Sequence, residues 1–224
     1  MSKQNMMFFK LAINSLLSRK GSVLLTLLAI TVSVYILIGV EQIRLQAKQS
    51  FNSSIAGTDL IVGARTGDIN LLLYAVFHMG SATQNISWQT YQELTTLNNV
   101  AWTVPISLGD SHKGYRVTAT TAAYFEHYQY ADLQPLEFAK GHPFDSVYSV
   151  VLGAEVANKF DYQLGSHIIL SHGLGMTSFT QHKDSPFKVT GILKPTGTPV
   201  DKSLYISLPG MEAIHTGWEN GSQV

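Results

Sequence analysis

The 224-residue chain is 45% hydrophobic, which is sufficient to bury a sizeable core in one or two domains. Fifteen basic residues balance fifteen acidic ones, so no excess of positive charge points to nucleic acid as a partner. Cysteine is absent, which excludes disulfide bonds, thiolate zinc sites and cysteine nucleophiles. Charged residues make up only 13% of the chain. This is about half the usual share, which indicates that part of the surface faces lipid or protein.

Residues 1–20 have the pattern of an amphipathic helix that lies along a membrane surface. From Phe8 onward, apolar residues alternate with polar ones at helical spacing. Two interpretations stay open. The segment can rest on lipid as an anchor, or a cytoplasmic partner can contact it. In the second case we expect the coupling contact to involve Leu16, Arg19 and Lys20.

Residues 21–41 predict a transmembrane helix. The stretch from Gly21 to Val40 contains no charge, and about twenty residues at a rise of about 1.5 Å match a hydrocarbon core about 30 Å thick. A buried core helix would show a polar stripe. A cleaved signal peptide would have a shorter apolar stretch, roughly 7–15 residues, followed by a small-x-small site. The residues around 38–42 do not offer such a site, so the spanning helix is the favoured interpretation.

The charges on either side of the apolar stretch predict its direction. Four basic residues precede it, whereas the residues directly after it carry mixed charge. Under the positive-inside rule the N-terminus is cytoplasmic and the main domain lies outside the cytoplasm. Residues 42–56 contain neither proline nor glycine, so we expect the helix to continue beyond the bilayer as a stiff stalk.

Residues 57–224 are expected to form an extracytoplasmic domain of class α+β, with two subdomains, because helices and strands alternate without a regular βαβ order. Alternating or short apolar runs predict strands at 59–62, 100–108, 115–121, 148–152, 167–171, 187–193 and 203–207. Helical spacing predicts helices at 70–77, 88–97, 122–128 and 153–160. Ser87 has the position of an N-cap, and residues 109–114 are expected to be the loop of a hairpin.

No catalytic residue is expected. The loop from Gly63 to Asp68 lacks the Gly-Lys-Ser/Thr ending of a phosphate-binding loop. A Gly-x-Ser-x-Gly elbow is also missing from the sequence. Phosphate-binding and hydrolase chemistry are therefore disfavoured.

Histidines supply the one candidate site. His167, His172, His182 and Asp184 lie within one stretch, and imidazoles with a carboxylate can bind zinc or copper. His167 and His172 are an odd number of residues apart, so on one strand they would face opposite sides. Two interpretations remain, namely solvated loop histidines and a metal site in a membrane-anchored periplasmic binding module.

Three segments, taken in order, resemble permeases of the MacB, FtsX and LolCE type. The N-terminal pattern is Ala12-Ile13-Asn14-Ser15-Leu16-Leu17-Ser18-Arg19-Lys20 with the apolar residues 24–30. The second segment is Val150-Val151-Leu152-Gly153 followed by Leu164-Gly165-Ser166 and Ile168-Ile169-Leu170. The third is Phe187-Lys188-Val189-Thr190-Gly191-Ile192-Leu193, continuing to Leu204-Tyr205-Ile206-Ser207.

The resemblance implies the permease subunit of a bacterial ABC transporter in the inner membrane. It implies that ATP is bound and hydrolysed by a separate cytoplasmic ATPase, so that this chain needs no cofactor and is not an enzyme. In such permeases the first helix relays motion to the periplasmic domain for export, extraction or signalling. The resemblance also implies a second permease subunit, contact with membrane lipid, and a periplasmic adaptor or substrate protein as a further partner.

The sequence departs from this family in one respect. Such permeases continue into further membrane helices after the outer domain, whereas this sequence has no second apolar span before Val224. We expect a fragment of a longer permease, and a shortened relative is the alternative.

Overall fold

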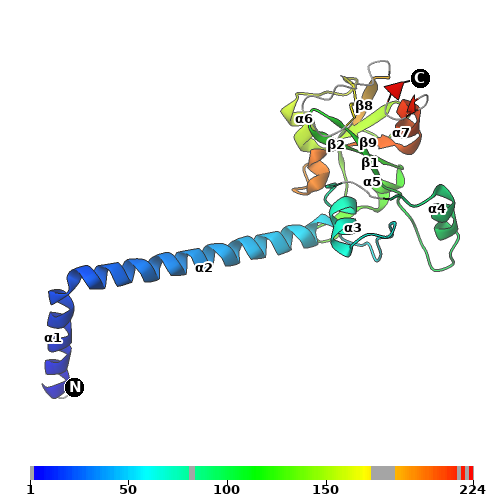
Figure 1. The fold of residues 1–224 in the computed structure, drawn as a ribbon. Coiled ribbons are helices and arrows are strands. Elements are labelled where there is room, and N and C mark those ends of the chain that lie inside the picture. The colour runs from blue at the N-terminus through cyan, green and yellow to red at the C-terminus, as the bar shows by residue number, and fades with distance from the viewer. Residues whose placement is uncertain (1–2, 81–83, 173–184, 216–217, 220–221, 224) are drawn as a thin grey trace. The chain divides into compact units, whose positions relative to one another are not determined.

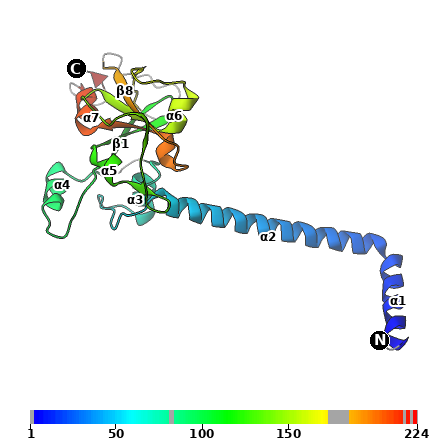
Figure 2. The ribbon, with the colours of Figure 1, turned by 180° about the vertical axis from the view of Figure 1, so that it is seen from behind.

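The computed structural model describes residues 3–80, 84–172, 185–215, 218–219 and 222–223. The chain divides into two compact units, Met1–Gln49 and Ser50–Val224, which are described separately below. Figure 1 labels the α-helices and some of the strands, and Figure 2 gives the reverse view.

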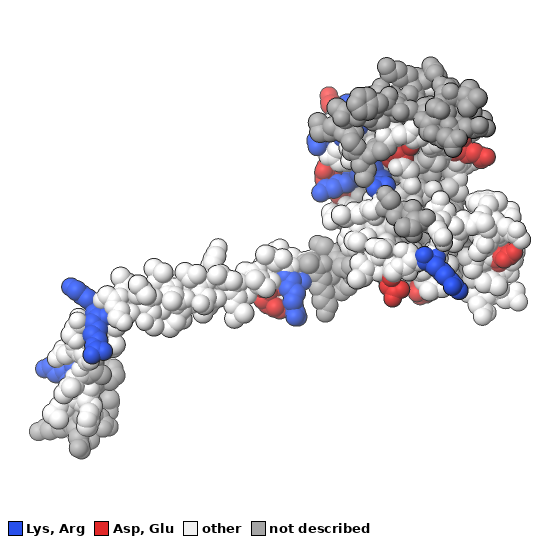
Figure 3. All heavy atoms as spheres, viewed as in Figure 1, with Lys and Arg blue, Asp and Glu red and all other residues white. Residues whose placement is uncertain are grey.

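The first unit is helical. It contains α1 (Lys3–Ser18) and most of α2 (Lys20–Ser54), which are separated by a turn at Arg19. The stretch Lys20–Gln46 of α2 is long and apolar enough to cross a membrane, with a mean hydropathy of 2.6 and no buried residue in its most apolar window. Figure 3 shows that the surface of this stretch is almost free of charged side chains. The apolar helix and its continuation beyond the hydrophobic stretch agree with the sequence-based prediction.

A mixed seven-stranded sheet forms the centre of the second unit. Its strand order is β1-β2-β9-β6-β8-β5, and the short β7 also pairs with β8. The pairs β2–β9 and β6–β8 are parallel, and the other pairs are antiparallel. The strands are β1 (Ser107–His112), β2 (Tyr115–Thr120), β5 (Phe138–Gly141), β6 (Ser149–Leu152), β7 (His167–Ile168), β8 (Phe187–Leu193) and β9 (Ser203–Ser207).

Shorter elements surround this sheet. The helices are α3 (Asp68–Ala75), α4 (Trp88–Thr95), α5 (Ala123–His127), α6 (Ala154–Lys159), α7 (Leu208–His215) and the 3₁₀ turn η1 (Pro199–Lys202). Two small two-stranded sheets pair β3 (Gln129–Tyr130) with β4 (Gln134–Pro135), and β10 (Trp218–Glu219) with β11 (Ser222–Gln223). The combination confirms the predicted α+β class. Residues Ser50–Val224 form one compact unit, so the predicted division of this domain into two subdomains stays a prediction.

Side chains from the central strands alternate between two apolar clusters, one on each face of the sheet. Val150, Leu152 and Leu204 belong to the cluster that also contains residues of α6 and α7. Val151 and Tyr205 belong to the other cluster, which contains residues of α5. Successive side chains of a strand point to opposite faces. The sheet is therefore covered on both faces, which explains why β6 and β9 each contain three consecutive apolar residues.

Most predicted elements are confirmed, including the N-cap at Ser87, whose Oγ accepts a hydrogen bond from the Thr90 amide at 3.1 Å. Two predictions are wrong. Residues 59–62 form no strand. Leu60 and Val62 are 76% and 47% exposed, and a lone apolar run cannot form a strand without a partner to complete its hydrogen bonds.

The predicted first strand of the hairpin was placed too early. It begins at Ser107 and not at residue 100, and the predicted loop residues 109–112 belong to β1. The turn consists of Lys113 and Gly114 alone, with φ values of 49° and 85°. Two consecutive positive φ angles are typical of the tight type I′ turn, which matches the twist of the strands it joins. The predicted strand at 167–171 is likewise shorter, because β7 ends at Ile168.

Candidate functional site

The end of α2 belongs to the second unit, where hydrogen bonds hold it. The Tyr128 hydroxyl donates to the Ser54 carbonyl, and the Ala56 amide donates to the Gln129 carbonyl at 2.9 Å. Burial raises the pKa of Tyr128, so its hydroxyl keeps the proton that it donates. The Tyr128 ring lies 5.0 Å from that of Tyr124, centroid to centroid, and Tyr124 belongs to the apolar cluster beneath α5. The last turn of α2 is thus tied to the core of the domain.

The coupling residues predicted from the sequence lie where α1 meets α2. Leu16 is in the last turn of α1, Arg19 forms the turn, and Lys20 is the first residue of α2. All three side chains are exposed. Hydrogen bonds from the Arg19 amide to the Leu16 carbonyl at 3.1 Å and from the Val23 amide to the Arg19 carbonyl at 3.0 Å hold the turn.

A cavity of about 820 Å³ lies between α3, α4 and the extended segments that flank them. Its lining includes Leu60, Tyr74, Trp88 and Trp102. The Tyr74 hydroxyl donates to the Leu108 carbonyl and accepts from the Leu108 amide, which joins α3 to the start of β1. Ligand pockets are typically about 300–1,000 Å³ and mostly apolar. The cavity therefore has the size and lining that suit an apolar ligand.

Two buried histidines fix parts of the domain to the sheet. His78, which follows α3, bonds through Nδ1 to Ser203 Oγ of β9 at 2.8 Å. Burial, reinforced by Arg116, lowers the pKa of His78 to about 4. His112 of β1 bonds through Nδ1 to the Ile169 carbonyl and through Nε2 to the Tyr162 hydroxyl, both at 2.8 Å. The hydrogen bond from His112 to Ile169 holds residues 169–172, the segment after β7, against β1.

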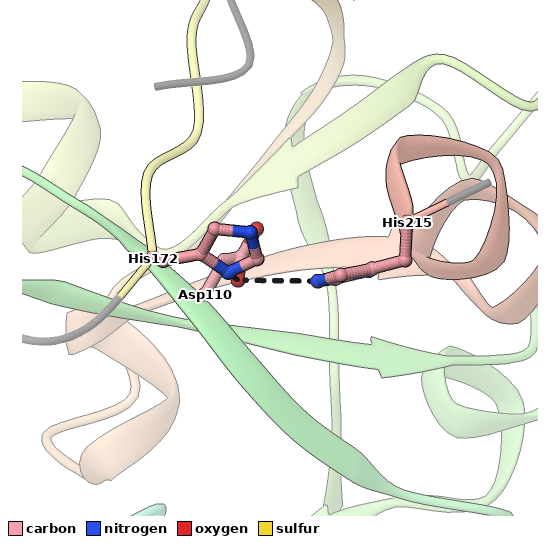
Figure 4. A group of neighbouring side chains, drawn as sticks. All are labelled: Asp110, His172 and His215. Carbon is pink, nitrogen blue, oxygen red and sulfur yellow. Dashed lines mark ion pairs between the residues drawn. The ribbon is translucent and has the colours of Figure 1, made fainter. Parts of the chain in front are cut away.

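A cluster of one carboxylate and two imidazoles lies beside β1 (Figure 4). Asp110 is in β1, His172 follows β7, and His215 ends α7. His172 Nδ1 is 2.9 Å from Asp110 Oδ1, and His215 Nε2 is 3.6 Å from the same oxygen. The two imidazole rings are 5.0 Å apart, centroid to centroid. One ligand atom from each residue lies within 4.8 Å of the other two, a spacing at which a single metal ion can be held.

The structure changes the metal-site residues expected from the sequence. It keeps His172 but joins it to Asp110 and His215, which the sequence reasoning missed. His167 is exposed in β7, paired with Lys188, and is not in the cluster. His182 and Asp184 lie outside the described residues. No sequence spacing could have found Asp110 and His215, because β1 and α7 are brought together only by the fold.

Comparison with known proteins identifies the family. Among solved structures, the chain is similar to the extracellular domain of the noncanonic ABC-type transporter YknZ from Gram-positive bacteria, with 16% identity and a TM-score of 0.37. The match covers 58% of this chain and 65% of that one, so the chain spans less than two thirds of that structure's length. No curated protein matches the sequence. Residues 23–223 match the family model of the MacB-like periplasmic core domain. The chain therefore belongs to the family of MacB-like periplasmic core domains, found in permease components of ABC transporters.

Proposed function

We propose that the chain is a permease subunit that transmits the work of a separate cytoplasmic ABC ATPase to its domain outside the cytoplasm. The observation that carries this proposal is the single helix α2, which contains a stretch long and apolar enough to cross a membrane, Lys20–Gln46, and ends at Ser54 in the second unit. The family match supports the transporter class. The chain would bind no nucleotide, and the motion would serve export, extraction or signalling.

The ends of α2 suit such a relay. At one end, Leu16, Arg19 and Lys20 are exposed around the α1–α2 turn, where an ATPase could grip them. At the other end, Tyr128 and the Gln129 backbone hold the last turn of α2 and the residues after it. The 35 residues of α2 contain no proline, the residue that most sharply kinks a helix. Movement at one end can therefore reach the other without being absorbed between them.

We further propose that the membrane is the bacterial inner membrane, that the N-terminus is cytoplasmic and that a second permease subunit completes the complex. A periplasmic adaptor or substrate protein would then meet the outer domain. Orientation is testable because the chain has no cysteine. With single variants Ser15→Cys and Asp132→Cys, a membrane-impermeant maleimide should label only Asp132→Cys in intact spheroplasts, and both after permeabilisation. Labelling of Ser15→Cys alone would reverse the orientation.

The relay itself is tested by breaking α2. The variant Gln46→Pro places a proline in the helix interior, which removes a hydrogen bond and kinks the helix at a cost of about 3 kcal/mol or more. Gln46→Ala is the matched control, because it keeps the helix. Each is combined with nitroxide labels at Ser15→Cys and Asp132→Cys and purified in complex with the ATPase.

In the control, the distance distribution between the two labels should change when ATP is added and trapped with vanadate. In Gln46→Pro, ATP hydrolysis should persist while this change is lost. An ATP-dependent change that is equal in both variants would contradict the relay through α2. Failure of any ATPase to assemble stoichiometrically with the chain would contradict the transporter proposal as a whole.

A further inference from the structure

We propose that Asp110, His172 and His215 bind one divalent transition-metal ion, with Zn²⁺ as the ion that fits best. The ion would fasten α7 and the segment after β7 to β1, and so would control how these three elements are held together. This inference goes beyond the transporter proposal and does not depend on it. It rests on the backbone that brings the three residues together, on the orientation of their donor atoms and on their chemistry.

A β-bulge places the carboxylate. In the β1–β2 hairpin, Leu108 pairs with Thr118 and Ser111 pairs with Arg116, so β1 carries one extra residue between these pairs. Bulges redirect a side chain that regular pairing would point elsewhere. Asp110 lies in this bulge and is buried, with 3% of its side chain exposed.

The same bulge brings α7 close. A Cβ atom at Gly109 would lie 2.8 Å from Met211 Cε, so the missing side chain leaves room for α7 against β1. His215 is one helical turn after Met211 and points to Asp110 (Figure 4). On the other side, an isolated bridge joins Ser171 to Ser111, with backbone hydrogen bonds of 2.9 Å in both directions. This bridge places His172, the next residue, opposite Asp110.

One ring nitrogen of each histidine lies close to Asp110 Oδ1. His215 Nδ1 lies 2.7 Å from the Met211 carbonyl, to which it donates its proton. The hydrogen bond fixes the tautomer in which Nε2 carries the lone pair, and Nε2 is the atom directed at Asp110. Metal-binding histidines typically donate their second ring N–H to a carbonyl or carboxylate in this way. The ring is thus oriented as a ligand before any ion is bound.

The ligand chemistry favours zinc. Two imidazole nitrogens and one carboxylate oxygen are a common Zn²⁺ set and leave a fourth tetrahedral position open. Bond lengths of about 2.0–2.1 Å put neighbouring tetrahedral ligand atoms about 3.3 Å apart. The distances from Asp110 Oδ1, 2.9 Å to His172 and 3.6 Å to His215, lie on either side of this value. The imidazoles are 32% and 37% exposed, so an ion can reach the buried carboxylate from solvent.

A hydrogen-bonded cluster that binds no metal is the competing interpretation, because the same distances suit a histidine–carboxylate ion pair. The two are separated by titrating the purified, untagged 224-residue chain in detergent micelles with Co²⁺. One equivalent should produce the intense visible absorption of four-coordinate cobalt, and Zn²⁺ should abolish it by displacement. Weak absorption that does not saturate at one equivalent would overturn the proposal.

Substitutions assign the site. In His172→Gln and His215→Gln, the Zn²⁺ dissociation constant, measured by competition with a chromogenic chelator, should rise more than the roughly 10–100-fold that loss of a supporting residue costs. His167→Gln is the matched control, because His167 lies in β7, before His172 in the chain, but not in the cluster. Its dissociation constant should stay that of the unsubstituted chain.

Thermal unfolding without metal checks that each variant folds. Both His172 and His215 are partly exposed, so their substitution should leave a folded chain. Zn²⁺ affinity that is retained in both cluster variants, or lost in His167→Gln alone, would overturn the assignment. ATPase coupling plays no part in this measurement, so a negative result here would leave the transporter proposal standing.

Discussion

Acidification is expected to destabilise the domain through His78. This side chain is 6% exposed, and its pKa is about 4, whereas an unfolded histidine titrates near 6.5. Ser203 Oγ donates to the Pro199 carbonyl at 3.1 Å, so it accepts the Nδ1 proton of a neutral His78. Protonation would place a positive charge in a buried site, and the positive charge of Arg116 opposes it further.

The sign and size follow from linkage. Between pH 6.5 and pH 4 the unfolded chain binds a proton at His78 that the folded chain does not, so stability is lost as the pH falls through this window. Above pH 6.5 both states are neutral at this residue and the effect vanishes. A difference of about 2.5 pKa units, at about 1.4 kcal/mol per unit, corresponds to about 3.5 kcal/mol over the whole titration. About 3 kcal/mol of this falls between pH 6.5 and pH 4, because each state is half titrated at one end of that window.

Urea unfolding of the chain in micelles, followed by intrinsic fluorescence at several pH values, measures this loss. The variant His78→Gln keeps a donor for Ser203 but cannot titrate. The unsubstituted chain should lose about 3 kcal/mol more than His78→Gln between pH 6.5 and 4. His112, whose pKa burial also lowers, is present in both proteins, so its contribution cancels. Parallel stability curves for the two proteins would refute a neutral, buried His78.

Two further predictions concern close contacts near η1. Gly153→Ala should destabilise the domain by about 1–3 kcal/mol, because its Cβ would lie 2.2 Å from the Val200 carbonyl oxygen. Gly67→Ala is the control, since Gly67 is an N-cap with similar dihedral angles and nothing within 4 Å; an equal loss in both variants would exclude crowding as the cause. Asp201→Ala should cost about 1–3 kcal/mol in urea unfolding, because its carboxylate accepts hydrogen bonds from the Thr196 amide and hydroxyl at 2.9 Å each. An unchanged urea midpoint would show that water replaces these bonds.

The residue pattern of a single segment was sufficient to predict some of the helices and strands. The apolar stretch of α2 could be found from length and flanking charge, and β8 and β9 from apolar runs of strand length. The same reasoning failed at residues 59–62, which have the composition of a strand but no partner strand. Whether an apolar run pairs depends on the rest of the fold, which the run itself does not encode.

Only one residue of the cluster Asp110, His172 and His215 could be predicted from the sequence. His172 could be singled out because it lies among other histidines in the sequence. Asp110 was assigned to a loop, because Gly109 beside it is typical of turns. A bulge between Leu108 and Ser111 cannot be recognised from one strand, since it is defined by the register with β2. The contact with His215 further requires α7 to pack on that bulge.

The position of β9 has a consequence for biogenesis. Residues Ser203–Ser207 lie between β2 and β6 and hydrogen-bond to both, although these two strands precede β9 by many residues in the chain. Until β9 is synthesised and inserted between β2 and β6, no strand joins the β1–β2 hairpin to the β6–β8 pair in the described sheet. Their apolar faces and open edges would stay exposed during that interval, which makes such intermediates prone to aggregation. We therefore expect the sheet to be completed only after β9 has been synthesised, when α2 has already left the ribosome.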